Sequence, residues 1–151
     1  MHGKQEEGER LLGAINVVLQ ALLLQEPSEG GRPLRYNPLD YAVLRRLEEN
    51  DGISGSELAR QLKIARTTLQ SALERLQRAG LLRKHVRPGQ KVRTLHLTAR
   101  GKNIRRKIHR HDLVNMTRLL SPLSAKQRSQ TIENLERIAA SFDDQTSAET
   151  L

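Results

Sequence analysis

The chain has 151 residues and a formal net charge of +9, from 26 lysines and arginines against 17 aspartates and glutamates. This length accommodates one domain. With one phenylalanine, two tyrosines and no tryptophan, the core must be aliphatic, and the few glycines and prolines favour helices over many short strands. The sequence contains no cysteine, which excludes disulfides, thiolate nucleophiles and cysteine-based metal sites and fits a reducing cytoplasm.

An apolar stretch over residues 11–24 predicts an amphipathic helix and not a membrane span or a signal peptide. It is shorter than the roughly 20 residues that a span needs. Asn16 and Gln20 interrupt it, and acidic residues precede it where a signal peptide is basic. Its apolar residues recur at helical spacing over residues 4–24. Residues 26–33 contain proline and two adjacent glycines and predict a loop.

Two helices are predicted next in the chain. Asn37 can cap the first of them, which begins with Pro38 and ends at about Asn50. Ser54 and Glu57 have the spacing of a capping box for the second, which is short.

A third helix, predicted over residues 66–79, has one apolar and one polar face and ends at Gly80, where a residue tolerant of positive φ is favoured. Side chains of the kind on its polar face suit the major groove of DNA. An ordinary solvated helix face is the alternative. Glu74 favours this alternative, because its carboxylate would face the phosphates of DNA, unless Arg78 neutralises the carboxylate. The candidate DNA-binding residues of this helix are Arg66, Thr67, Thr68, Gln70, Ser71, Arg75 and Arg78.

A β-hairpin follows, because residues 81–86 and 92–97 resemble strands and the Pro88-Gly89 pair between them signals a turn. Thr98 is placed to cap a long helix that reaches about Leu120. The hairpin is basic at its tip. Its candidate DNA-binding residues are Lys84, Arg87, Gln90, Lys91 and Arg93.

The C-terminal part opens with Ser124 and Gln127, a second capping box, and ends in polar residues 143–151, which predict a disordered tail. The helices at both ends of the chain carry leucine and isoleucine stripes, which would form a large apolar patch if exposed. Burial against a second copy removes that patch; packing within one subunit is the alternative. The expected dimerisation residues are Leu11, Leu12, Ile15, Val18, Leu19, Leu22, Ile132, Leu135 and Ile138.

Positive charge is concentrated in one stretch. Residues 81–111 contain eleven lysines and arginines and no acidic residue, whereas the other 120 residues have a net charge of −2. A polyanionic partner would account for this, because phosphate neutralisation releases counterions. A solvated helix face is the alternative.

Four motifs follow one another in this region: Leu39-Asp40-Tyr41-Ala42-Val43-Leu44, Ser56-Glu57-Leu58-Ala59-Arg60-Gln61-Leu62, Leu73-Glu74-Arg75-Leu76-Gln77-Arg78-Ala79-Gly80-Leu81-Leu82-Arg83 and Leu95-His96-Leu97-Thr98-Ala99-Arg100-Gly101. In this order they resemble the MarR family of bacterial winged helix-turn-helix transcriptional regulators. The resemblance implies a mainly α fold with a small β-hairpin wing, in which a DNA-binding lobe (37–100) lies between dimerisation segments (1–36 and 101–142). It also implies a homodimer with its recognition helices in the major groove and its wings along the minor groove or backbone.

The sequence departs from the family pattern at two places. Ala65 stands where the family usually has a small polar cap, and the wing tip lacks the common Asp-x-Arg pair. Lys91 or Arg93 would then substitute for the wing arginine.

We therefore expect a sequence-specific, double-stranded DNA-binding regulator, by default a repressor, that acts on a pseudo-palindromic operator. The family implies a small aromatic or anionic effector, in a crevice where Arg45, Arg46, Tyr36 or Tyr41 lie. A winged-helix module that binds an acidic protein partner is the alternative. An RNA binder fits less well, because the hairpin lacks stacking aromatics.

The sequence predicts no enzyme, cofactor or metal site. It has no glycine-rich phosphate loop, nucleophile elbow or metal-binding helix motif. His109 and His111 are the best metal candidates, but two residues apart on a helix they point in different directions.

Overall fold

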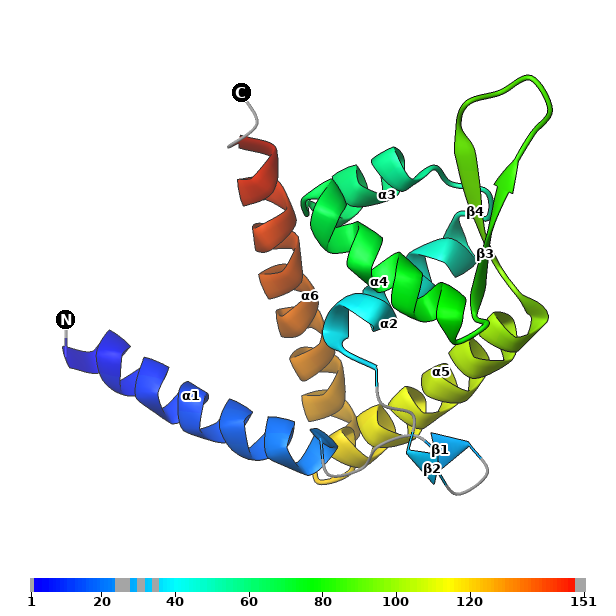
Figure 1. Ribbon diagram of the computed structural model, residues 1–151. Helices are drawn as coiled ribbons and strands as arrows, with labels where there is room; N and C mark the ends of the chain where they lie inside the picture. The colour runs from blue at the N-terminus through cyan, green and yellow to red at the C-terminus, as the bar shows by residue number, and fades with distance from the viewer. Residues whose placement is uncertain (1, 24–27, 30–31, 34–35, 149–151) are drawn as a thin grey trace. The chain divides into compact units, whose positions relative to one another are not determined.

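The computed structural model describes residues 2–23, 28–29, 32–33 and 36–148 of the chain (Figure 1). In chain order the elements are α1 (His2–Leu23), β1 (Ser28–Glu29), β2 (Arg32–Pro33), α2 (Pro38–Glu49), α3 (Gly55–Leu62), α4 (Arg66–Arg78), β3 (Leu82–Val86), β4 (Arg93–Leu97), α5 (Ala99–Leu120) and α6 (Ala125–Ala148). The chain divides into two compact units, Met1–Asp112 and Leu113–Leu151. Among the described helices, none is both long and apolar enough to cross a membrane.

The fold class predicted from the sequence is confirmed: the protein is mainly helical, with one β-hairpin after three short helices. Asn37 caps α2 by accepting a hydrogen bond from the Asp40 amide at 2.9 Å, and Pro38 occupies the first turn. The capping box before α6 forms in both directions, because the Ser124 and Gln127 side chains each accept the other's amide hydrogen.

Of the two hydrogen bonds that define the capping box predicted before α3, the structure shows one. The Ser54 hydroxyl accepts from the Glu57 amide at 3.2 Å, as expected. The Glu57 carboxylate instead accepts from Arg60 Nε at 2.9 Å and from Gln61 Nε2 at 3.1 Å. The hydrogen bond from Arg60, followed by that from Gln61, lowers the pKa of Glu57.

The structure differs from the sequence prediction at two further places. The segment expected as a loop contains the antiparallel ladder of β1 and β2, in which Ser28 pairs with Pro33 and Glu29 with Arg32. In the sequence, two glycines separate these strands, a pair favoured in short hairpin turns. At the other end, α6 continues to Ala148, into the segment expected as a disordered tail. Residues 143–148 contain no glycine or proline that would end a helix.

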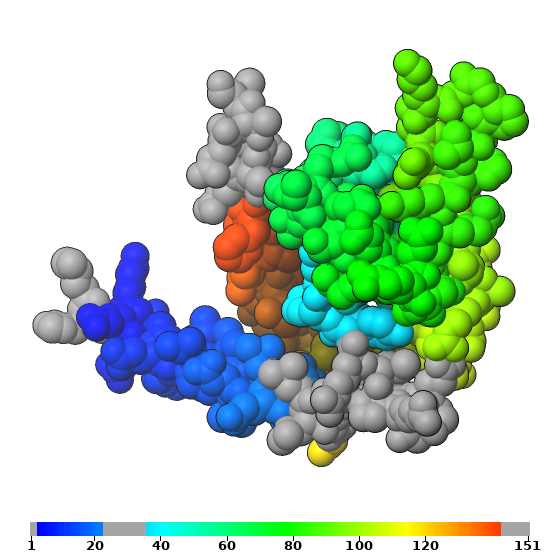
Figure 2. Space-filling view, viewed as in Figure 1, coloured from blue at the N-terminus to red at the C-terminus, as the bar shows by residue number. Residues whose placement is uncertain are grey.

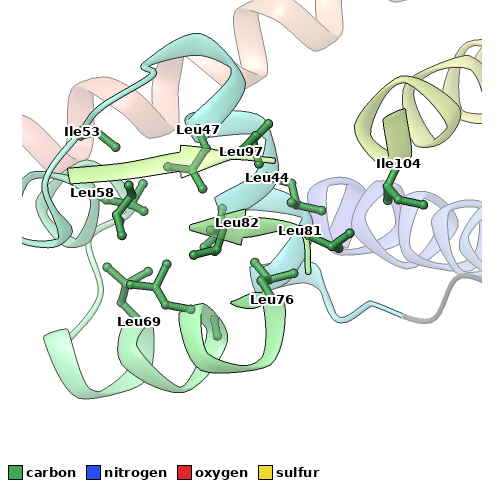
Figure 3. Close-up of a cluster of buried hydrophobic side chains, with 14 of the residues drawn as sticks. Leu44, Leu47, Ile53, Leu58, Leu69, Leu76, Leu81, Leu82, Leu97 and Ile104 are labelled. Carbon is green, nitrogen blue, oxygen red and sulfur yellow. The ribbon is translucent and has the colours of Figure 1, made fainter. Parts of the chain in front are cut away.

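The core of the first unit is aliphatic, as the composition predicted. Leucines from α2, α3, α4 and the hairpin meet around a common centre, and Ile104 of α5 closes it on one side (Figure 3). Leu44, Leu58 and Leu81 have no exposed surface. Full burial of a leucine side chain contributes about 1.5–3 kcal/mol relative to exposure, so this cluster holds α4 and the hairpin in place.

The hairpin, here called the wing (residues 82–97), is anchored at its base. β3 and β4 pair in antiparallel register, with Leu82 opposite Leu97 and Val86 opposite Arg93. The segment before α3 pairs with β4, because Gly52 donates to the Leu95 carbonyl at 3.0 Å and Leu95 donates to Ile53 at 2.9 Å. The wing is therefore joined to the helices by backbone hydrogen bonds as well as by packing.

The start of α5 is joined to the end of α4. The Thr98 hydroxyl donates to the Gly80 carbonyl at 2.6 Å and accepts from the Gly101 amide at 3.0 Å, which confirms Thr98 as the helix cap. At Gly101 a Cβ atom would lie 1.9 Å from the Leu81 carbonyl oxygen. The two backbones can approach this closely because residue 101 is glycine.

Candidate nucleic-acid interface

α4 presents a polar face to solvent, as its sequence predicted. Leu69, Ala72, Leu73 and Leu76 are buried in the core. The side chains on the opposite face are exposed: Thr67, Gln70, Ser71, Glu74 and Arg78. The helix begins after Ala65, which supplies no side-chain cap. The turn between α3 and α4 ends α3 and lets α4 start in a new direction. In this turn Lys63, the C-cap of α3, adopts a left-handed conformation with φ 55°.

α4 and the wing lie on the same face of the first unit, with the wing tip projecting past α3 and α4 (Figure 2). The turn at the tip contains Gly89 at φ 79°, and Gln90 donates to the Arg87 carbonyl at 3.0 Å. The side chains of Arg87, Gln90, Lys91 and Arg93 are exposed, while Lys84, nearer the base, is half-buried.

A hollow of about 390 Å³ lies between the start of α3, α4 and the wing, and we call it the wing hollow. Four of its lining residues are cations, and none is acidic. The residues are Ser54, Gly55, Ser56, Arg66, Gln70, Leu73, Lys84, Lys91, Val92, Arg93 and Leu95. Side chains from distant parts of the sequence, such as Gln70 and Lys91, which are 21 residues apart, therefore line the same surface. Such a surface attracts phosphate groups.

The structure brings together part of the predicted DNA-binding set. Arg66, Gln70, Lys84, Lys91 and Arg93 line the wing hollow, whereas the remaining candidates do not. Thr67, Thr68 and Ser71 lie on the exposed part of α4, and the Ser71 hydroxyl donates to the Thr67 carbonyl at 3.4 Å.

Arg75 and Arg78 of α4 are engaged within the protein. Arg75 Nη2 donates to the buried Asp40 carboxylate of α2 at 2.8 Å. Arg78 Nε donates to the main-chain oxygen of Glu74 at 3.4 Å. The Glu74 carboxylate accepts from Gln70 Nε2 at 3.0 Å. The sequence spacing allows Arg78 to neutralise Glu74; among the described interactions the carboxylate instead accepts from Gln70.

Sequence reasoning missed six residues of the wing hollow. Three are apolar, Leu73, Val92 and Leu95, and the other three, Ser54, Gly55 and Ser56, lie at the start of α3. The Arg66 guanidinium donates to the Ser56 hydroxyl, so the first turns of α3 and α4 are linked. A serine-rich N-cap region immediately before a helix was the available signal, but the pairing with Arg66 depends on the turn between the helices.

The expected dimerisation residues are largely accessible in the single chain. On α1, Leu11, Leu12, Ile15 and Leu19 are exposed, and Val18 and Leu22 are half-buried. On α6, Ile132, Leu135 and Ile138 are exposed, together with Phe142, which is 65% accessible. Each helix thus carries an apolar stripe that its own unit leaves uncovered.

A second hollow in the first unit lies between α2 and α5, with a volume of about 760 Å³. Its lining includes Tyr41, Arg45, Arg46, Arg105 and His109, together with Glu49 and Asp112. The arginines already have acidic partners: Arg45 Nε lies 3.2 Å and Arg46 Nη1 3.5 Å from Glu49, and Arg105 Nε lies 3.1 Å from Glu48.

Comparison with known proteins agrees with this arrangement. Residues 36–83 match the family described as winged helix-turn-helix DNA-binding. An HTH-type transcriptional repressor of Mycobacterium tuberculosis is 27% identical over 131 residues, which cover 85% of this chain and 94% of the relative.

Solved structures show the same fold. The transcriptional regulator SlyA has a TM-score of 0.68 at 26% identity, over 89% of this chain and 95% of that one. MarR has a TM-score of 0.71 at 21% identity, over 91% and 93%. FabT of Streptococcus pneumoniae, in complex with DNA, has a TM-score of 0.75 at 19% identity, over 93% and 97%.

Proposed function

We propose that this chain, a DNA-binding transcriptional regulator of the MarR family, works as a homodimeric repressor on a pseudo-palindromic duplex site. The wing hollow carries the proposal: four cations and Gln70 surround it, and no acid lines it. The polar face of α4 would enter the major groove, where Arg66, Thr67, Thr68, Gln70 and Ser71 can reach base edges. The wing cations would contact phosphates. Such a protein would act in the cytoplasm.

Arg75 contributes less to this interface than the sequence expects, because it holds Asp40. Arg78, Arg87 and Gln90 would contact the DNA backbone from the end of α4 and from the wing tip. A cation at a phosphate fixes position without recognising sequence, so base preference should come from α4.

The test is a DNA-binding titration at several salt concentrations. We expect Lys91→Ala and Arg93→Ala each to weaken binding to preferred and scrambled duplexes alike, and to make the log–log salt slope shallower by about one. Lys126→Ala on α6 is the control, since it also removes one exposed positive charge but from an element that belongs neither to α4 nor to the wing. Gln70→Ala should weaken binding to the preferred duplex by about 1–3 kcal/mol.

Two results would contradict the proposal. One is a pair of wing variants with the salt slope of the parent protein. The other is a parent protein that binds duplex DNA with neither salt dependence nor sequence preference. Either result would favour the alternative function, a protein-interaction module with an acidic partner.

The dimer rests on the apolar stripes of α1 and α6. A second copy would bury side chains such as Leu12 and Leu135, which are 60% and 56% exposed, and would supply two recognition helices for half-sites about 10 base pairs apart. Light scattering should give twice the chain mass. Deleting residues 1–24 should cause aggregation or loss of DNA binding, and a soluble truncated chain that binds DNA normally would refute this.

The hollow between α2 and α5 supports an effector site for a small aromatic anion. Tyr41 offers a ring, and a carboxylate could replace Glu49 beside Arg45 and Arg46. Benzoate, the simplest aromatic carboxylate, is the first probe. We expect it to release DNA from the parent protein and to fail with Arg46→Met; equal release from both proteins would exclude this site.

A further inference from the structure

The proposed recognition residue Gln70 is not an independent side chain, because Glu74 holds its amide. Gln70 Nε2 lies 3.0 Å from Glu74 Oε1, and the two residues are four apart on α4, the spacing at which helical side chains meet. Both side chains are exposed. Gln70 also lines the wing hollow, where four cations would gather phosphates.

The chemistry of this contact determines which way the Gln70 amide points. An ionised carboxylate can only accept hydrogen bonds, so the group that faces Glu74 must be the amide NH₂ and not the amide oxygen. One amide hydrogen is used in this contact. With the hydrogen trans to Oε1 facing Glu74, the cis hydrogen and Oε1 lie side by side and offer a ligand one donor beside one acceptor.

One donor beside one acceptor is the pattern that adenine satisfies in the major groove. Its N7 accepts and its N6 amino group donates, so a glutamine amide can bind it with two hydrogen bonds. An amide held in one orientation presents this pattern before DNA arrives, which lowers the entropy lost on binding.

We propose that Glu74 is a positioning residue, which locks the Gln70 amide so that it recognises one adenine in each half-site. This inference rests on the proposed DNA-binding function and deepens it. It also accounts for an acidic side chain on the face turned toward DNA. The Glu74 carboxylate weakens binding to every duplex by repelling phosphates, and the locked amide confers preference for one base.

The expected effect can be bounded from the conformations that Gln70 regains. Without Glu74 the amide can point in two opposite directions, and the preceding torsion has about three staggered positions, so the binding orientation is depleted by up to about sixfold. Removing the amide altogether, in Gln70→Ala, should reduce the preference for adenine by about 5-fold to 150-fold.

The experiment uses the full chain and a preferred site obtained by selection from random duplexes. Dissociation constants are measured for every single-base variant of that site with the parent, Gln70→Ala, Glu74→Ala and the double variant. Glu74→Gln is the matched control, since it removes the charge but keeps a hydrogen-bonding partner. Because both side chains are exposed, the variants should fold, and thermal denaturation checks this.

We expect Glu74→Ala to strengthen binding to scrambled duplexes and to reduce the preference for adenine at the same position as Gln70→Ala. In the Gln70→Ala background, Glu74→Ala should have no further effect on preference. Glu74→Gln should strengthen binding equally but keep part of the preference. In the DNA-free protein, NMR should show a rigid Gln70 side-chain NH₂ that becomes mobile in Glu74→Ala.

Three outcomes would overturn the inference while leaving the proposed function intact. Glu74→Ala could leave base preference unchanged, or the position affected by Gln70→Ala could prefer a base other than adenine. Glu74→Ala could also change preference at another position in the Gln70→Ala background, which would mean that the carboxylate contacts a base itself. A parent protein without sequence preference would overturn both proposals.

Discussion

Replacing Arg75 by alanine should destabilise the fold more than it weakens DNA binding. The Asp40 side chain is 6% exposed and lies 2.8 Å from Arg75 Nη2, while the Arg75 side chain is 43% exposed. Removing one partner of a fully buried pair costs about 3–5 kcal/mol, whereas an exposed pair is worth about 0–1 kcal/mol. Since only the carboxylate is buried here, we expect a loss of about 2 kcal/mol.

The matched variant, Asp40→Asn, leaves the half-exposed guanidinium to be solvated by water, so it should cost about 1 kcal/mol. In the Asp40→Asn background, Arg75→Ala should cost little more, because no buried charge is left without a partner. The four proteins form a double-mutant cycle, measured by urea denaturation. For a chain of this size, a loss of about 2 kcal/mol lowers Tm by roughly 4–8 °C.

The result that would refute this reasoning is a stable Arg75→Ala variant. If it unfolds at the urea concentration of the parent but binds the preferred duplex much more weakly, Arg75 contacts DNA and its ion pair with Asp40 contributes little to stability.

Three other perturbations have defined outcomes. Gly101→Ala should cost about 2 kcal/mol or more of stability, because its Cβ would lie 1.9 Å from the Leu81 oxygen. Gly13→Ala, which has open space around it, should instead stabilise α1 by about 0.5–1 kcal/mol. Equal Tm values for the two variants would contradict this. The Arg60 hydrogen bond lowers the pKa of Glu57 below its usual 4.5. The ionised Glu57 carboxylate therefore stabilises the fold above pH 4.5, and this contribution is lost as the pH falls through the lowered pKa. Glu57→Gln should accordingly show a shallower loss of Tm in acid. Because the sequence has no cysteine, peroxide should not cause a DNA release that dithiothreitol reverses, as gel-shift assays can check.

The order and the boundaries of the helices in the first unit could be predicted because their signals are local. Asn37 and Thr98 act on amides three residues away, and the leucine spacing of α4 determines its buried face without reference to the rest of the chain. The hairpin was likewise indicated by its Pro-Gly turn. In each case the residues that carry the signal lie within one or two turns of each other.

Contacts between distant segments could not be predicted in this way. The Arg75–Asp40 pair joins residues 35 apart, and its existence depends on how α2 and α4 cross. The donors that bind the Glu57 and Glu74 carboxylates could not be predicted either. A capping box, an ion pair and a contact with a side-chain amide all have spacings that a helix allows. The sequence therefore predicted which residues face outward on α4, but not which of them are held by neighbours.

The cations around the wing hollow have a consequence for the lifetime of the protein. Arg66, Lys84, Lys91 and Arg93 repel one another when no anion lies between them, so the DNA-free fold carries an electrostatic cost that bound phosphates remove. A duplex present at about 100 times its Kd adds about 2.7 kcal/mol to the stability of the folded state. Because proteolysis in cells follows the population of opened molecules, DNA-bound molecules of the regulator should be degraded more slowly than unbound ones. Occupancy of the site would in this way set the turnover of the regulator.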